Sequence, residues 1–179
     1  MLIGLLSDTH VRVAGHNVSL STLTSSELPI QIREAFRGVD LILHAGDVYS
    51  LPILDTLETI APVLVAEGDD DPFDTTIDRR VKHTQTITVE GVTIWVSHYG
   101  EWAEDSSKKP PDIIVYGHTH RSKLEDQNGT ILINPGSPTF PGYDYVLGTV
   151  GFISIKSGKA EARIMQLEGE IGGFPNYAK

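Results

Sequence analysis

Residues 40–47 read DLILHAGD, an apolar run that ends abruptly in a polar tip. Two other segments among the first 70 residues share this pattern, with apolar runs at residues 2–6 and 62–66. A continuous apolar run of this length, followed at once by polar residues, is typical of a strand buried on both faces. The three runs therefore predict the parallel core of an α/β protein.

Segments with helical spacing of apolar residues lie between these strands. The first runs from Pro29 to Gly38, and the second covers residues 51–60. Alternation of strand and helix predicts right-handed crossovers, which bring the carboxyl ends of the strands to one edge of the sheet. The Ser- and Thr-rich stretch 11–26 is predicted to be a polar loop.

After about residue 82 the pattern changes to short paired strands. Hairpins are predicted around Glu90-Gly91, Gln127–Gly129 and Lys156–Lys159, and residues 112–116 form another apolar strand. We expect these strands to build a second sheet. The predicted fold class is α/β, a four-layer αββα sandwich of two mixed β-sheets flanked by helices.

The composition limits the function. The 179 residues carry 14 Lys and Arg against 24 Asp and Glu, a formal net charge of −10, which argues against a long nucleic acid as partner. The length suits one domain, placed at 1–167, with a loosely ordered tail over 168–179. No apolar run suits a membrane span or a signal peptide, so we expect a cytoplasmic protein that does not bind membranes.

Side chains that bind metals follow the apolar strands. They are Asp8, His10, Asp47, Asp69, His98, His118 and His120. We expect them to converge at one sheet edge, and alternate residues of an extended tip, such as Asp8 and His10, to point the same way. Cysteine is absent, so the ligands are carboxylates and imidazoles, which suit two divalent ions such as Mn, Fe, Ni, Co or Zn.

Each motif alone has a commoner structural explanation. An Asp-x-His pair is mostly a turn, a Gly-Asp after a strand is mostly a helix N-cap or a turn, and an acidic run such as Asp69–Asp71 is mostly solvated. Two histidines at one strand exit, His118 and His120, are costly to place without a partner. The joint occurrence of the motifs, each at a strand end, favours a metal site.

In this order, the motifs resemble the signature of the calcineurin-like metallophosphoesterases. They are DxH at 8–10, GD at 46–47, GD at 68–69, His98 and GHTH at 117–120. The short chain and the INPGS segment at 133–137 resemble the small single-domain phosphodiesterase branch. The resemblance spans about residues 1–140 and implies the metallophosphoesterase fold.

The resemblance also implies a ligand set. One ion would bind Asp8, His10, Asp47 and His120, and the other would bind Asp47, Asp69, His98 and His118. Asp47 would bridge two divalent ions, with Mn favoured, and a metal-bridging hydroxide would hydrolyse a small phosphoester, a phosphodiester more readily than a monoester. Two such ions cancel about four negative charges, so the acidic balance does not exclude this substrate.

Two positions near the ligands depart from the family pattern. Asp69 stands where the family usually has Asn, and Asp70 stands where it often has His. No imidazole is then placed to protonate a leaving group, and Asp70 is the candidate proton donor. We hypothesise that the enzyme favours esters with good leaving groups.

Other residues near the motifs have expected roles beside the ligands. Tyr99-Gly100 replaces the Gly-His of many relatives and changes the mouth of the site. Arg121 is a candidate phosphate contact, although a surface salt bridge is equally expected. His44 is predicted to support the site or the core rather than to ligate, and His16 and His83 to lie in a loop and on the surface.

Two rival functions remain. The first is a non-catalytic metal-binding interaction scaffold like the retromer subunit of this fold, which also carries Gly-Asp at the position of Gly68-Asp69. The second is a structural domain that binds a single metal. The presence of both His10 and Asp47 favours the enzyme. Exposed edge strands would allow a homo-oligomer.

Overall fold

The computed structural model describes residues 1–11, 28–100, 109–141 and 146–169. The strands are β1 (Leu2–Leu6), β2 (Leu41–His44), β3 (Val63–Ala66), β4 (Val81–Lys82), β5 (Gln85–Val89), β6 (Val92–Val96), β7 (Ile113–Val115), β8 (Lys123–Gln127), β9 (Thr130–Asn134), β10 (Thr149–Lys156) and β11 (Lys159–Gln166). The helices are α1 (Ile30–Ala35), α2 (Leu51–Glu58) and α3 (Phe73–Thr76). The predicted polar loop at 11–26 lies almost entirely outside the described residues.

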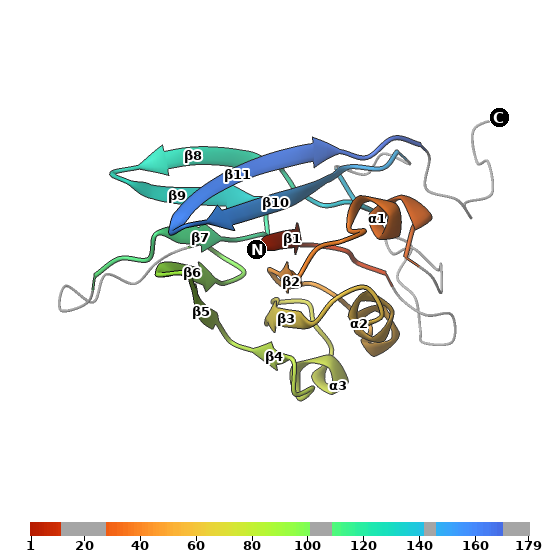
Figure 1. Ribbon diagram of the computed structural model, residues 1–179. Coiled ribbons are helices and arrows are strands. Elements are labelled where there is room, and N and C mark those ends of the chain that lie inside the picture. Colours follow the sequence, from red (N-terminus) through yellow and green to blue (C-terminus); the bar gives the residue numbers. More distant parts are fainter. Residues whose placement is uncertain (12–27, 101–108, 142–145, 170–179) are drawn as a thin grey trace.

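Two mixed sheets form the framework, in agreement with the predicted fold class (Figure 1). The six-stranded sheet has the order β11-β10-β1-β2-β3-β4, in which β1 to β4 run parallel. The five-stranded sheet has the order β5-β6-β7-β9-β8, in which β6, β7 and β9 run parallel. The predicted parallel pairing of the first three strands and the hairpins at Glu90-Gly91 and Asn128-Gly129 are confirmed.

The hairpin of β10 and β11 corrects one prediction. It belongs to the six-stranded sheet, where β10 pairs antiparallel with β1 and Gly151 lies opposite Leu5. The reason is that β10 is apolar on both faces, with Phe152 packed toward the helices and Ile153 packed between the sheets. Such a strand fits beside β1, in the interior of a sheet covered on both sides.

Alternation along the strands divides the core into two layers. Leu6 of β1 belongs to the cluster beneath α1 and α2, whereas Ile3 and Leu5 belong to the cluster between the two sheets. Helix, sheet and sheet thus make three of the four expected layers, and no described residue forms a helical layer over the five-stranded sheet.

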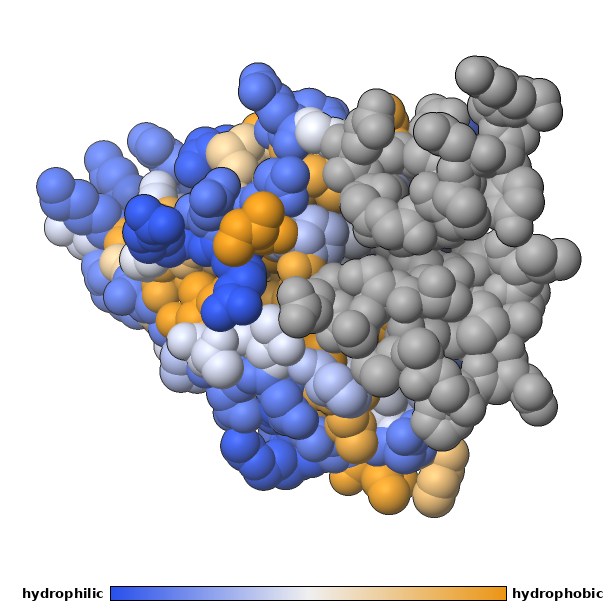
Figure 2. Space-filling view, turned by 90° about the vertical axis from the view of Figure 1, so that its right-hand side faces the viewer, coloured by the Kyte–Doolittle hydropathy of each residue, from blue (hydrophilic) through white to orange (hydrophobic). Residues whose placement is uncertain are grey.

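On the side where the helices lie, the described surface is mainly hydrophilic with scattered apolar atoms (Figure 2). In the described part of the chain, no helix has both the length and the apolar character needed to cross a membrane. The expected tail at 168–179 lies outside the described residues except for Glu168 and Gly169. The Gly169 carbonyl accepts a hydrogen bond from the Leu147 N–H.

Candidate metal centre

The residues predicted as ligands come together where the strands of both sheets end. Three groups have ligand atoms that all lie within 4.8 Å of one another. They are Asp8, His10 and His120; Asp69, His98 and His118; and Asp8, Asp47 and His98. All seven predicted ligands therefore belong to at least one group.

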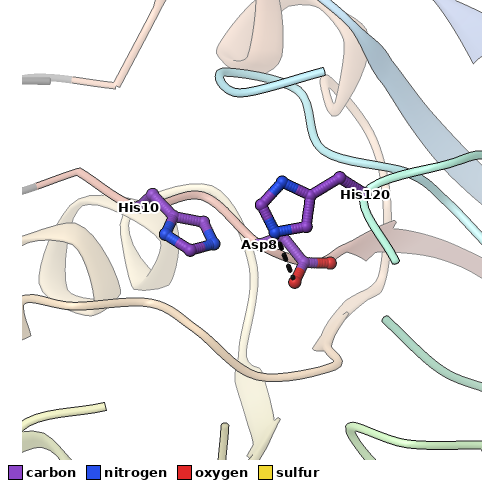
Figure 3. Close-up of side chains that lie close together, drawn as sticks. All are labelled: Asp8, His10 and His120. Atoms are coloured by element: carbon purple, nitrogen blue, oxygen red, sulfur yellow. Dashed lines mark ion pairs between the residues drawn. The ribbon is translucent and has the colours of Figure 1, made fainter. Parts of the chain in front are cut away.

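The first group joins the ends of β1 and β7. The Asp8 carboxylate lies 3.5 Å from His120 Nε2, and the rings of His10 and His120 have centroids 4.7 Å apart. Figure 3 shows both imidazoles turned toward the Asp8 carboxylate. Asp8 is fully buried and His10 nearly so, which makes this the more enclosed part of the centre.

The second group joins the ends of β3, β6 and β7. Asp69 Oδ1 lies 2.8 Å from His98 Nε2 and 3.3 Å from His118 Nδ1. His98 is buried, whereas the side chains of Asp69 and His118 are 40% and 47% exposed. This group therefore opens to solvent on one side.

Asp47 lies between the two groups. Its Oδ2 atom is 3.5 Å from His10 Nε2 and 3.5 Å from His98 Nε2. The other oxygen, Oδ1, accepts a hydrogen bond from the Asp70 N–H at 3.1 Å. One carboxylate thus faces both groups, as expected of a bridging ligand.

Backbone carbonyls orient two of the imidazoles. Nδ1 of His98 lies 2.7 Å from the Ala45 oxygen, and Nδ1 of His120 lies 3.0 Å from the Phe140 oxygen. A carbonyl oxygen only accepts, so Nδ1 carries a proton in both rings and Nε2 is the nitrogen that a metal ion would bind. Both Nε2 atoms point at carboxylates of the centre.

Buried polar atoms at the centre fit a cation. Among the described residues, Asp8 Oδ2, His10 Nε2 and His98 Nε2 are buried without a hydrogen-bond partner. Burial raises the pKa of Asp8, raises that of Asp47 to about 7 and lowers that of His10 to about 3. A divalent cation would satisfy the unpaired atoms and compensate the buried carboxylates, and three carboxylates with four imidazoles are a suitable donor set.

The backbone conformation at the ligands differs from the extended tips expected from the sequence. Left-handed φ values occur at Asp8 (52°), His10 (46°), Asp47 (59°), His118 (65°) and His120 (58°). Each such conformation is costly for a residue with a side chain and persists only where the surroundings impose it. The DxH and HTH pairs therefore reach their sites through strained turns.

Glycines before the ligands allow the strand ends to approach closely. A Cβ on Gly68 would collide with the backbone nitrogen and Oδ1 of Asp47, and a Cβ on Gly117 would collide with Ser7 Oγ. A Cβ on Gly46 would lie 2.6 Å from His98 Nδ1. The Gly in each motif is thus required by the close approach of the next strand end.

The residues that hold these turns are Asp71, which the sequence analysis missed, and residues of the INPGS segment, which the sequence favours as a structural turn. Asp71 accepts hydrogen bonds from the N–H groups of Asp47, Val48, Tyr49 and Gly68. In the INPGS segment, Ser137 Oγ donates to the Asp8 carbonyl at 2.7 Å, and Asn134 Nδ2 donates to the Gly117 carbonyl at 2.8 Å. The only available signals were the third Asp of the acidic run and the polar residues of INPGS.

Three further candidate residues, Asp70, Arg121 and Tyr99, lie near the ligands in the sequence. The Asp70 carboxylate accepts a hydrogen bond from the Tyr49 hydroxyl at 2.7 Å, and its role as proton donor stays a prediction. Arg121 is exposed and makes no ion pair with a described residue, so its phosphate contact also stays a prediction. Tyr99 packs against His118, with ring centroids 4.7 Å apart.

The remaining histidines are not among these groups. His44 is fully buried behind the centre, with Nε2 3.2 Å from Thr9 Oγ1, in line with a supporting or core role. His83 is exposed beside Glu67, as predicted, and His16 lies outside the described residues.

Comparison with known proteins identifies the class. The model of the calcineurin-like phosphoesterase superfamily domain matches residues 1–158, so the chain belongs to this superfamily. A probable metallophosphoesterase of Methanothermobacter thermautotrophicus is 32% identical over 149 residues, 79% of each chain. A phosphodiesterase of Methanocaldococcus jannaschii is 23% identical over 181 residues, covering 94% of this chain and all of that protein.

Solved structures share the fold. An archaeal phosphodiesterase matches with a TM-score of 0.66 and 19% identity, covering 92% of this chain and all of that one. Vps29 of Entamoeba histolytica, solved with Zn²⁺, matches with a TM-score of 0.65 and 20% identity, covering 93% and 99% of the two chains. Enzymes and Vps29 proteins thus share this architecture, and function has to be argued from the site.

Proposed function

We propose that the protein is a dinuclear-metal-dependent phosphodiesterase that hydrolyses a small phosphoester. The observation that carries the proposal is the position of Asp47 Oδ2, 3.5 Å from an imidazole nitrogen of each ligand group. Membership of the superfamily supports the phosphoesterase class, and the phosphodiesterase among the relatives supports a diester over a monoester.

Each ion would have four protein ligands. Asp8, His10, Asp47 and His120 would hold one, and Asp47, Asp69, His98 and His118 would hold the other, with Mn favoured. When bound, two divalent ions supply a water activated near neutral pH and absorb negative charge on the phosphoryl oxygens.

The side chains of the protein supply position and charge around this chemistry. His98 and His120 keep Nε2 toward the centre because carbonyls fix their Nδ1 protons. Arg121, exposed directly after His120, is the candidate contact for a substrate phosphate oxygen. The acidic outer surface disfavours a long polyanion, so the substrate is a small ester.

Hydrolysis of an activated aryl phosphodiester tests the proposal. Metal-stripped protein should gain activity on addition of Mn²⁺, with Ni²⁺, Co²⁺, Fe²⁺ and Zn²⁺ as comparison metals. Asp47→Asn and His120→Ala should lose about 100-fold or more of kcat/KM. His83→Ala, at an exposed histidine outside the centre, should retain full activity.

The number of metal ions bound per chain and the presence or absence of hydrolysis distinguish the proposed enzyme from the two rival functions. Two ions per chain are expected, whereas a single ion would favour a structural metal domain. Absence of hydrolysis with every divalent metal would contradict the enzyme and favour an interaction scaffold.

A further inference from the structure

An aromatic side chain stands on the open side of the centre. Tyr99 directly follows His98, and its ring contacts both His98, with centroids 5.3 Å apart, and His118, with centroids 4.7 Å apart. The Tyr99 side chain is nevertheless 54% exposed. It therefore borders the second ligand group without being enclosed by it.

The other rings at the centre are in a different situation. Tyr49 packs on His10 with centroids 4.5 Å apart and is only 9% exposed. Phe140 packs on both His10 and His120 and is half-buried. These two rings enclose the first ligand group, whereas Tyr99 keeps much of its surface available.

Charge around Tyr99 restricts what binds there. Asp69 belongs to the second group and Asp70 follows it directly. Both are exposed, and the Asp70 carboxylate repels a further anionic group on a substrate. A neutral planar group is compatible with these carboxylates and gains stacking energy on an exposed aromatic ring.

We propose that Tyr99 is a stacking platform for a planar aromatic group on the part of the phosphoester that stays on phosphorus after cleavage, such as a nucleobase. The inference rests on the proposed function for the position of the phosphate, which would lie at the ligand groups beside this ring. Tyr99 then determines specificity: it binds the substituent and takes no part in the bond cleavage.

Two substrates with the same leaving group isolate this effect. Thymidine 5′-(p-nitrophenyl phosphate) and methyl p-nitrophenyl phosphate both release p-nitrophenolate. After cleavage the phosphate of the first still carries a nucleoside with a planar base, whereas the phosphate of the second carries only a methyl group. Tyr99→Leu should raise KM for the thymidine ester about tenfold and leave kcat and the methyl ester nearly unchanged. Tyr99→Phe keeps the ring and should keep the preference.

Equilibrium binding separates this inference from the proposed function. In Mn²⁺-loaded protein, thymidine 5′-monophosphate should bind more tightly than inorganic phosphate, and Tyr99→Leu should abolish most of the difference. If the nucleotide binds more tightly than phosphate through Tyr99 but neither ester is hydrolysed, the proposed phosphodiesterase function is overturned and the stacking role of Tyr99 stands. The platform is overturned if wild-type protein does not prefer the nucleotide, or if Tyr99→Leu weakens both ligands or both esters equally.

Discussion

The Asp71 carboxylate lies 3.2 Å from the backbone nitrogen of Asp47 and accepts its hydrogen bond. The same carboxylate accepts hydrogen bonds from Val48 at 2.7 Å, Tyr49 at 2.9 Å and Gly68 at 2.9 Å. One side chain therefore ties the turn after β2 to the turn after β3. Since both turns carry predicted ligands, Asp71 holds them in register.

We expect Asp71→Asn to weaken metal binding roughly 10- to 100-fold, the range seen when residues that orient ligands are changed. Asn offers one acceptor oxygen, and its amide N–H group would face backbone donors. Calorimetric titration of Mn²⁺ measures the effect. Glu161→Gln on the exposed face of β11 is the matched control. Equal Mn²⁺ affinities for the two variants would contradict the role of Asp71 in holding the two ligand turns together.

Acid stability should depend on His44. Burial, with repulsion from His98 and His10, lowers the pKa of His44 to about 3 in the folded state, below the ordinary value of 6.5. Between these values the unfolded chain binds more protons, so the stability that is present above about pH 6.5 is lost as the pH falls toward 3.

His44→Gln removes this titration. We compare the unfolding free energies of His44→Gln and the wild-type protein with a chelator present. The value for the variant minus that for wild type should increase by up to about 1.4 kcal/mol for each unit by which the pH falls below 6. Denaturant titrations at pH 7, 6 and 5 measure it. A curve for His44→Gln that runs parallel to that of the wild-type protein would refute the prediction.

Asp69 stands where the family usually has Asn, and Oδ1 of Asp69 lies 2.8 Å from His98 Nε2. Asp69→Asn removes a negative charge from the second ligand group. We expect roughly tenfold weaker binding of one ion, because ligand charge sets affinity, and a higher kcat at saturating metal. Metal titrations and kcat at saturating Mn²⁺ test both expectations. An unchanged affinity would contradict the expected contribution of the Asp69 charge to metal binding.

The rate of hydrolysis should depend strongly on the leaving group, because Asp70 rather than a histidine directly follows Asp69. For a series of aryl phosphodiesters, log kcat/KM should fall steeply as the pKa of the leaving phenol rises. Asp70→His should flatten the slope by supplying a proton donor. A flat profile for the wild-type protein would count against the hypothesis.

The alternation of apolar runs and polar tips predicted that the seven candidate ligands lie close together, because it determines which edge of a sheet each residue reaches. It could not place the hairpin of β10 and β11, since a strand that is apolar on both faces suits the interior of either sheet. The alternation also could not predict that Asp71 joins the turn after β2 to the turn after β3. That role depends on left-handed turns at Asp47 and Tyr49, which no glycine signals.

Strand β1 lies between β2 and β10, although β10 comes near the end of the sequence. During synthesis the ribosome releases the chain from its amino terminus, so β1 has only one neighbour until residues 149–156 emerge. Asp8 follows β1 directly, and its carbonyl depends on Ser137, also made late. A nascent chain shorter than this lacks the contacts that hold Asp8 in place, so a metal ion would bind at this centre only after β10 has paired with β1.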